Sequence, residues 1–255
     1  MELLRRERIS KTYGSRQILR DISIRLEKNE LVSLLGQSGV GKTTLLNILS
    51  GLVRPDAGRV FLSGREITGQ PGQISYMLQK DLLLEHKLVI DNVALPLVIR
   101  GTKKQEGREK ASSYFETFDL EGTQLLYPAQ LSGGMRQRAA LLRTYLGSQG
   151  VILLDEPFSA LDMITRAQLH DWYLEIVQRV GLSTILITHD VDEAIQLSDR
   201  ICILTGHPGE IRHEIRIGVP REERKDFSLQ PEFTAYKRQI RDILAGREEQ
   251  PCGDA

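Results

Sequence analysis

A short stretch near the amino terminus combines glycines, a lysine and two threonines at a spacing suited to phosphate chemistry. It reads Gly36-Gln37-Ser38-Gly39-Val40-Gly41-Lys42-Thr43-Thr44. Glycines allow successive backbone N–H groups to close around a phosphate chain without Cβ clashes. Lys42 can reach the β- and γ-phosphates as a mobile charge, and the hydroxyl of Thr43 can coordinate Mg²⁺. The stretch therefore predicts a loop that binds a nucleoside triphosphate with magnesium.

The segments on either side of this stretch predict a strand before it and a helix after it, as a phosphate-binding loop requires. The apolar run Leu31 to Leu35 predicts a buried strand, and residues Thr43 to Leu49 predict a helix that Gly51 ends. A phosphate loop joins the end of a strand to the start of a helix, and the helix N-terminus adds partial positive charge. The alternative, a glycine-rich turn with a chance lysine, explains the pattern and its context less well.

Two carboxylates follow a second apolar run. Val151-Ile152-Leu153-Leu154 predicts a buried strand that ends in Asp155-Glu156-Pro157. In a protein with a phosphate loop, Asp155 is suited to hold Mg²⁺ and Glu156 to polarise an attacking water. The alternative is an acidic turn. Another strand, Thr184 to Ile187, ends at His189, which could donate a hydrogen bond to a γ-phosphate.

Two further segments carry weaker patterns. Leu131-Ser132-Gly133-Gly134-Met135 precedes a predicted helix over residues 136–146, with Ser132 as N-cap. It could bind a second anion, although most such pentapeptides only cap helices. Tyr13 lies ahead of the phosphate loop, where an aromatic ring could stack on a base, but spacing alone favours packing.

The remaining periodicity predicts a mixed α/β protein. Alternation over residues 3–26 predicts antiparallel strands, and a stretch lacking it, residues 80–130, predicts a helical insert with helices over 90–99, interrupted by Pro96, and over 105–118. Predicted elements elsewhere are strands over 59–62, 74–78, 201–204 and 211–217, a helix over 165–180, and an amphipathic C-terminal helix carrying Phe233, Tyr236, Ile240 and Ile243 before a tail frayed from Gly246.

An apolar cluster and the other histidines leave alternatives open. The insert begins with an apolar cluster of four leucines, Leu82, Leu83, Leu84 and Leu88. These leucines are about equally well interpreted as a subdomain core and as a partner-binding surface. Trp172, on the helix over 165–180, is core or rim. The other histidines have no setting like that of His189 and are interpreted as solvated or structural; they are His86, His170, His207 and His213.

Composition narrows the class of protein. The chain has 255 residues, 40% hydrophobic and 27% charged, with 34 basic and 34 acidic residues, so no global field attracts nucleic acid or acidic membrane. Two cysteines, Cys202 and Cys252, are too few for a disulfide framework and fit a reducing cytoplasm. We find no signal peptide or bilayer-spanning run and expect any membrane role to be peripheral.

In combination, the motifs resemble the nucleotide-binding subunits of ATP-binding cassette (ABC) transporters. The matching elements follow that family's order; they are Tyr13, Gly36 to Thr44, Gln79, Leu131 to Met135, Val151 to Glu156, Ser159 to Asp162 and His189. The resemblance implies a P-loop NTPase core with a mixed sheet, an N-terminal antiparallel β-subdomain and a helical insert. It implies a single domain over 1–255: core 1–79 and 131–220, insert 80–130, C-terminal helix and tail 221–255.

The resemblance also implies roles that spacing does not reveal. ATP would lie between the phosphate loop of one subunit and the Ser132-Gly133-Gly134 segment of another in a homodimer. Tyr13 would stack on adenine, Gln79 would touch the metal and couple to transport, Asp162 would communicate across the dimer, and His189 would sense the γ-phosphate.

One departure from the family pattern points to a branch. The pentapeptide ends in Met135 where the family most often has Gln, and Arg136-Gln137-Arg138 follows, as is frequent in importer-type subunits. The run Asp155 to Asp162 resembles the nitrate, sulfonate and taurine importer group. The resemblance thus implies a subunit at the cytoplasmic membrane face, with an integral permease and, indirectly, a solute-binding protein as partners.

Two other classes of protein use parts of this pattern. ABC-type ATPases of nucleic-acid repair or translation usually add long coiled coils or a second cassette, and this chain has neither sustained heptads nor basic charge. We expect no nucleic-acid partner. A free-standing P-loop kinase would leave Leu131 to Met135 and His189 without a purpose.

Overall fold

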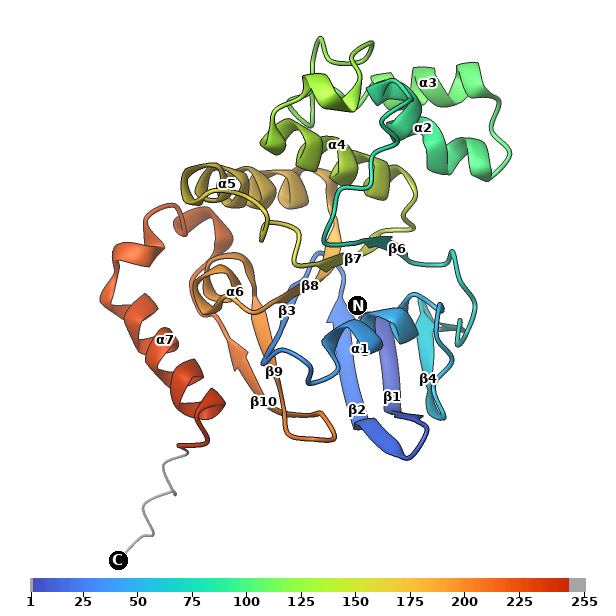
Figure 1. The fold of residues 1–255 in the computed structure, drawn as a ribbon. Helices are drawn as coiled ribbons and strands as arrows, with labels where there is room; N and C mark the ends of the chain where they lie inside the picture. Colours follow the sequence, from blue (N-terminus) through green and yellow to red (C-terminus); the bar gives the residue numbers. More distant parts are fainter. Residues whose placement is uncertain (1, 248–255) are drawn as a thin grey trace, which may run out of the picture.

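The computed structural model describes residues 2–247, which form two sheets flanked by helices (Figure 1). The larger sheet has strand order β10-β9-β3-β8-β7-β6, parallel except for the antiparallel pair β9–β10. Its strands are β3 (Leu31–Gly36), β6 (Ser75–Met77), β7 (Val151–Asp155), β8 (Ser183–Thr188), β9 (Arg200–Thr205) and β10 (Glu210–Arg216). Every residue of β3 and β8 is buried, as expected for central parallel strands.

The smaller sheet is antiparallel, in the order β2-β1-β4-β5. Its strands are β1 (Glu2–Tyr13), β2 (Arg16–Glu27), β4 (Ala57–Leu62) and β5 (Arg65–Glu66). In β2, Ile22, Ile24 and Leu26 are buried and the residues between them are exposed. This alternation confirms the sequence prediction of strands with one solvated face.

Seven α-helices and three short 3₁₀ turns complete the described part of the chain. The helices are α1 (Lys42–Leu49), α2 (Val89–Ile99), α3 (Lys104–Ser112), α4 (Gly133–Leu146), α5 (Met163–Val180), α6 (Val191–Leu197) and α7 (Pro231–Leu244). The 3₁₀ turns are Pro128–Gln130, Arg221–Glu223 and Phe227–Leu229. The short elements α6 and β5 were not predicted. Cys252 and most of the tail expected to fray from Gly246 lie outside the described residues.

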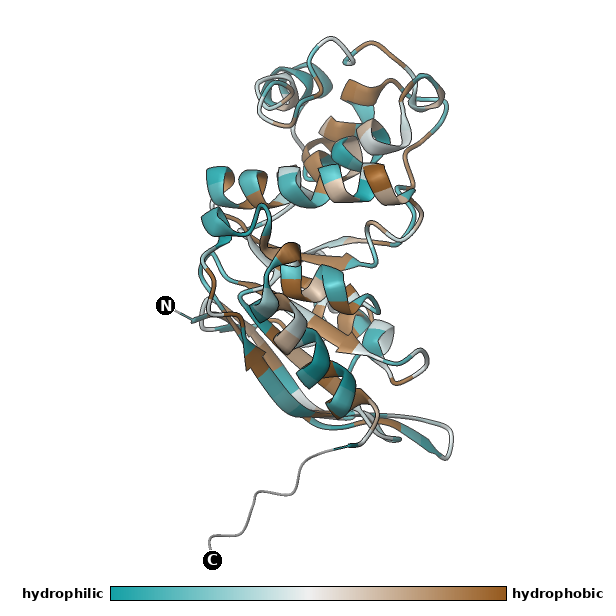
Figure 2. Ribbon diagram, turned by 90° about the vertical axis from the view of Figure 1, so that its left-hand side faces the viewer, coloured by the Kyte–Doolittle hydropathy of each residue, from teal (hydrophilic) through white to brown (hydrophobic). Residues whose placement is uncertain are grey.

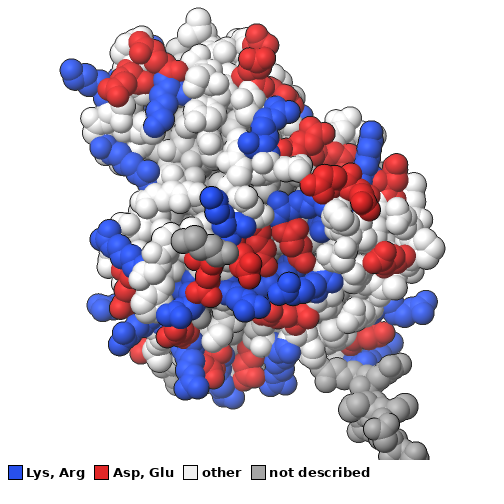
Figure 3. Space-filling model, turned by 180° about the vertical axis from the view of Figure 1, so that it is seen from behind, with Lys and Arg blue, Asp and Glu red and all other residues white. Residues whose placement is uncertain are grey.

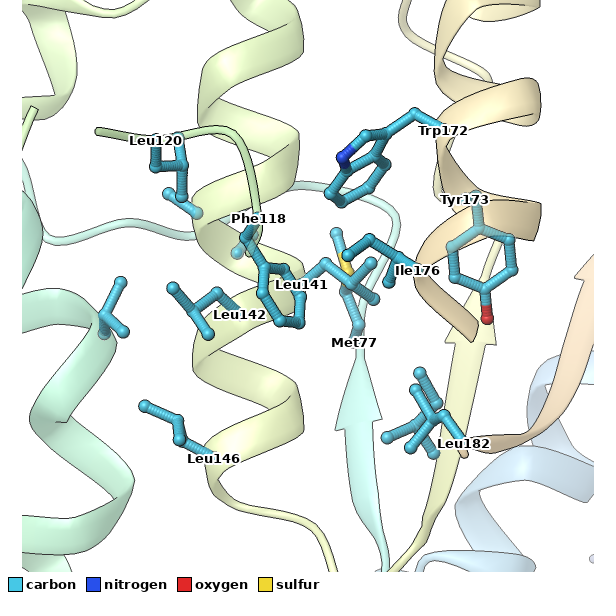
Figure 4. Close-up of a cluster of buried hydrophobic side chains, with 14 of the residues drawn as sticks. Met77, Phe118, Leu120, Leu141, Leu142, Leu146, Trp172, Tyr173, Ile176 and Leu182 are labelled. Atoms are coloured by element: carbon cyan, nitrogen blue, oxygen red, sulfur yellow. The ribbon is translucent and has the colours of Figure 1, made fainter. Parts of the chain in front are cut away.

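The insert helices α2 and α3 lie with α4 at one end of the molecule, and the antiparallel sheet lies at the other (Figure 1). Hydrophobic residues concentrate on the strands and on the helix sides that face the interior (Figure 2). A large apolar cluster joins the insert to the parallel sheet through α4 and α5 (Figure 4). Trp172 is 6% exposed within this cluster and is therefore a core residue.

Two insert predictions need correction. The helix predicted over 105–118 ends at Ser112, because turn-type hydrogen bonds such as Phe115 N to the Ser112 carbonyl (3.2 Å) replace the helical pattern. These turns place Phe115 and Phe118 in the core, where both are fully buried. Conversely, α2 continues through Pro96, because burial of its apolar face offsets the hydrogen bond that proline removes.

Candidate functional site

The glycine-rich loop connects β3 to α1, as the sequence predicts. Gly39 and Gly41 have φ angles of 79° and 111°, which side-chain-bearing residues rarely adopt. At Gly36, an added Cβ would lie 2.5 Å from the Leu204 carbonyl oxygen. The three glycines thus serve both backbone conformation and close packing. Gln37, Ser38 and Gly39 are exposed, which leaves this part of the loop open to a ligand.

Lys42 is the first residue of α1, and its side chain turns back over the loop. Its ammonium donates to the carbonyls of Gly36 (2.7 Å) and Gln37 (3.0 Å). Burial lowers the pKa of Lys42, and the nearby charges of Glu156 and Asp155 oppose this shift. A buried cation that is paired mainly with carbonyl dipoles is suited to bind an anion that enters the loop.

Asp155 lies at the carboxyl end of β7, beside α1. Its side chain accepts a hydrogen bond from the Tyr76 hydroxyl (2.9 Å), and the side chain of Thr43 lies close to it. Burial raises the pKa of Asp155, although the Tyr76 hydrogen bond opposes the shift. Carboxylate and hydroxyl oxygens are ligands that Mg²⁺ accepts beside nucleotide phosphates, so this pair fits the predicted metal.

Tyr76 was missed in the sequence, where β6 was predicted only as a strand. Parallel pairing of β6 with β7 sets Tyr76 opposite Leu153 and brings its hydroxyl to Asp155. No local pattern indicates this contact, because it depends on which strands are neighbours.

Three polar side chains from distant segments meet beside the loop. Nδ1 of His189 lies 3.0 Å from Glu156 Oε1, and Nε2 of Gln79 donates to Glu156 Oε2 (3.4 Å) and to the Ser159 hydroxyl (3.2 Å). Glu156 has a φ of 47°, an uncommon backbone conformation for a residue with a side chain. Its carboxylate is thereby directed between Gln79 and His189.

The other predicted site residues lie elsewhere in the chain. Ser132 caps α4 and accepts a hydrogen bond from Met135 N (3.3 Å), while Asp162 caps α5. Tyr13 ends β1 and is 49% exposed, and the Lys11 ammonium lies 5.3 Å from the centroid of its ring. Within residues 2–247, no hydrogen bond joins Ser132, Asp162 or Tyr13 to the phosphate loop.

The apolar cluster of the insert is divided between core and surface. Leu83 is buried, and Leu88 packs partly buried against the same core. Leu82 is 51% exposed and borders a groove between β6, α2 and α4. Among the histidines set aside, His170 is structural, because its Nε2 lies 3.0 Å from Glu193 and its ring packs edge-on against Phe158.

The strand–loop–helix, the buried lysine and the two carboxylates at the end of a parallel strand define a P-loop ATPase. The model of the ABC transporter family matches residues 19–159, and the chain belongs to that family. It is an ATP-binding, ATP-hydrolysing subunit of that family.

Curated relatives span nearly the whole chain. The formylaminopyrimidine import ATP-binding protein ThiZ of Halalkalibacterium halodurans is 38% identical over 95% of this chain and 96% of its own. An aliphatic sulfonates import ATP-binding protein, SsuB 1, of Xanthomonas axonopodis pv. citri is 40% identical over 92% of both chains. The nitrate import ATP-binding protein NrtD of Synechocystis is 36% identical over 92% of this chain and 91% of its own.

A solved relative has the same fold. A bacterial ABC transporter cassette determined as a dimer aligns with a TM-score of 0.71 and 27% identity, over 86% of this chain and all of that chain. The cassette fold predicted from the sequence is therefore confirmed.

Proposed function

We propose that this chain powers a membrane permease that imports a small solute such as nitrate, a sulfonate, taurine or a related molecule. The observation that carries the proposal is the convergence of Gln79, Glu156 and His189 beside a phosphate loop whose Thr43 contacts Asp155. The names of the relatives support import of small solutes.

In the proposed reaction, the backbone amides of residues 36–44 and the Lys42 ammonium hold the phosphates of ATP. Thr43, Asp155 and Gln79 would hold Mg²⁺, which neutralises phosphate charge when bound. Glu156 accepts a proton from the attacking water as general base, and His189 donates a hydrogen bond toward the γ-phosphate. The 3.0 Å contact of His189 with Glu156 supports the proposal that both groups act at the γ-phosphate.

The ATP site is proposed to be completed by a second copy of the chain. Ser132, Gly133 and Gly134 lie at the N-terminus of α4, which attracts anions, yet among the described residues no hydrogen bond joins them to their own phosphate loop. Beside them, Met163 and Ile164 at the start of α5 are 80% and 69% exposed. A partner subunit would bury these exposed apolar side chains. Their exposure therefore supports a dimer in which each Ser132 segment closes over the other subunit's ATP.

The groove between β6, α2 and α4 is proposed to receive the permease. It has a volume of about 460 Å³, and its rim carries the exposed apolar residues Leu78, Leu82 and Ile99. Gln79 follows Leu78 directly, so an occupant of the groove would adjoin a residue that contacts Glu156. No helix within residues 2–247 is long and apolar enough to cross a membrane.

A nucleic-acid role is not supported by surface charge. On the face seen in Figure 3, Lys and Arg side chains are interspersed with Asp and Glu, and the whole chain has zero formal net charge. Proteins that bind nucleic acid usually present a basic patch or stripe. We therefore propose a permease and a second copy of the chain as direct partners.

The test is the Lys42→Ala variant, with the exposed Lys28→Ala variant as a matched control. Removal of the phosphate-loop cation should abolish ATP hydrolysis and greatly weaken ATP binding while the melting temperature stays close to that of the wild type. The measurements are ATPase rate, nucleotide titration and thermal melting. Substantial turnover by a folded Lys42→Ala protein would overturn the assignment.

A further inference from the structure

Arg166 lies on the first turn of α5, next to the site but outside every motif identified in the sequence. Its backbone N–H donates to the carbonyl of Asp162 (2.9 Å), and its guanidinium Nη2 donates to the carbonyl of Leu161 (2.8 Å), with the Ser159 carbonyl at 3.5 Å. The guanidinium therefore binds backbone oxygens of the loop from Glu156 to Asp162. That loop begins with the proposed general base and ends with a residue expected to face the second subunit.

The other side of the guanidinium faces the segment that carries His189. Nη1 of Arg166 lies 3.8 Å from Asp190 Oδ2. Asp190 itself is fixed, because its Oδ1 accepts hydrogen bonds from Asp192 N (2.9 Å) and Glu193 N (3.3 Å) at the start of α6. Arg166 thus connects the loop after Glu156 to the residue that follows His189.

These groups surround a small cavity of about 50 Å³ that the proposed catalytic side chains also line. Its lining includes Glu156, Ser159, Arg166, His189 and Asp190. Nε of Arg166 is buried and has no hydrogen-bond partner, whereas the other guanidinium nitrogens are engaged. A buried N–H at a polar cavity of this size is suited to a water molecule, which would join Arg166 to the same enclosure as Glu156 and His189.

We propose that Arg166 is a positioning residue for ATP hydrolysis, which holds the loop from Glu156 to Asp162 in register with His189. The inference deepens the proposed function and rests on it, because it takes Glu156 and His189 as the reacting pair. Glu156 occupies an uncommon backbone conformation that persists only when the surrounding structure fixes it, and Arg166 supplies part of that fixation. Arg166 contacts neither the phosphate loop nor Asp155 within the described hydrogen bonds and ion pairs, so ATP binding does not depend on it.

The test compares Arg166→Ala with Arg179→Ala, an exposed arginine near the other end of α5. Displacement of a reacting group by about 1 Å costs up to roughly 10²-fold in rate, so kcat of Arg166→Ala should fall by about 10-fold or more. KM for ATP and the melting temperature should stay near the wild-type values, because only the transition-state geometry is affected. Arg166→Lys, which keeps a cation near Asp190, should recover part of kcat, and Arg179→Ala should behave as wild type.

A second comparison tests whether Arg166 acts through Asp190. Asp190→Asn keeps a cap for α6 but removes the charge that faces Arg166. If both residues act through this contact, the double variant with Arg166→Ala should have the same kcat as the less active of the two single variants. If the two single variants reduce kcat independently, so that their effects multiply in the double variant, the inference is overturned. An unchanged kcat in folded Arg166→Ala would also overturn it, as would a decrease in kcat that follows the decrease in melting temperature across these variants. If Arg166→Ala does not fold, Arg166→Gln takes its place in each comparison. Glu156→Gln is assayed alongside these variants. If Glu156→Gln hydrolyses ATP at the wild-type rate, the proposed function is refuted. If Glu156→Gln loses turnover but Arg166→Ala keeps the wild-type kcat, only the role of Arg166 is refuted.

Discussion

Two neighbouring leucines at the start of the insert, Leu82 and Leu83, should differ widely in how much stability the protein loses when each is replaced by aspartate. Leu83 is 5% exposed within the insert core, whereas Leu82 is 51% exposed on the rim of the proposed permease groove. A buried leucine replaced by a small residue costs about 2–5 kcal/mol, and a buried carboxylate without a partner adds to that cost. Leu83→Asp should therefore lose about 4 kcal/mol or more, a large part of the ~5–15 kcal/mol that stabilises a typical domain.

The corresponding change at Leu82 should leave the fold intact. A fully buried leucine contributes about 1.5–3 kcal/mol, and half of the Leu82 surface is already solvated, so Leu82→Asp should lose about 1.5 kcal/mol or less. For a chain of this size these values correspond to melting-temperature decreases of about 8–16 °C or more for Leu83→Asp and below about 6 °C for Leu82→Asp. The basal ATPase rate of Leu82→Asp should persist.

The assay is co-purification with the cognate permease, identified from neighbouring genes, and solute uptake by the reconstituted complex. Leu82→Asp should fail to co-purify or to drive uptake, whereas Leu52→Asp, which places the same charge at an exposed leucine after α1, should do both. Normal uptake by Leu82→Asp would refute the groove as the docking site. An equal loss of stability at both leucines would refute the division between core and rim.

Further predictions concern the proposed adenine contact and the insert. Tyr13→Ala should weaken ATP binding by about 5- to 150-fold, since stacking contributes ~1–3 kcal/mol per base, whereas Tyr13→Phe should bind as wild type. Equal binding by Tyr13→Ala and wild type in a nucleotide titration would exclude stacking. The pKa of Asp81 is lowered: burial alone would raise it, but hydrogen bonds from Arg136 and from the Leu83 amide outweigh that effect. A lowered folded-state pKa stabilises the fold above the unfolded pKa of ~3.9 and loses that contribution as pH falls through the folded pKa. Asp81→Asn should therefore lose about 1 kcal/mol at pH 7 in urea unfolding, after allowance for solvent screening, and the difference from wild type should shrink below about pH 4; no difference at pH 7 would contradict the ion pair.

The phosphate loop could be predicted in detail because its determinants are contiguous in the chain. Gly36 to Thr44, the apolar run before it and the helix after it specify one local structure, and the observed β3–loop–α1 unit agrees with that prediction. The positions of Asp155 and His189 followed from a similar argument, because both lie at or just past the carboxyl ends of adjacent parallel strands, β7 and β8. Periodicity and strand direction were sufficient for these features.

Contacts between distant segments could not be predicted from local patterns. The hydrogen bond from Tyr76 to Asp155 depends on the pairing of β6 with β7, and the contacts of Arg166 depend on how α5 packs beside the loop after Glu156. The early end of α3 has the same origin, since burial of Phe115 and Phe118 outweighs the helical propensity of that segment. Family resemblance alone indicated a site role for Gln79, as a metal contact, and its hydrogen bond to Glu156 was not predicted.

The central claim, that two copies of this chain hydrolyse ATP at shared sites with Glu156 as general base, is tested most directly by the mass of Glu156→Gln in solution with Mg-ATP. The amide keeps the shape of the carboxylate but cannot accept the proton of the attacking water, which should reduce turnover by about 10²- to 10⁴-fold and spare binding. Because ATP is proposed to bind across the interface, its occupancy should stabilise the dimer by mass action. We predict a dimer with Mg-ATP and a monomer without nucleotide or with ADP, whereas a variant that stays monomeric with ATP bound, or hydrolyses ATP at the wild-type rate, would contradict the account.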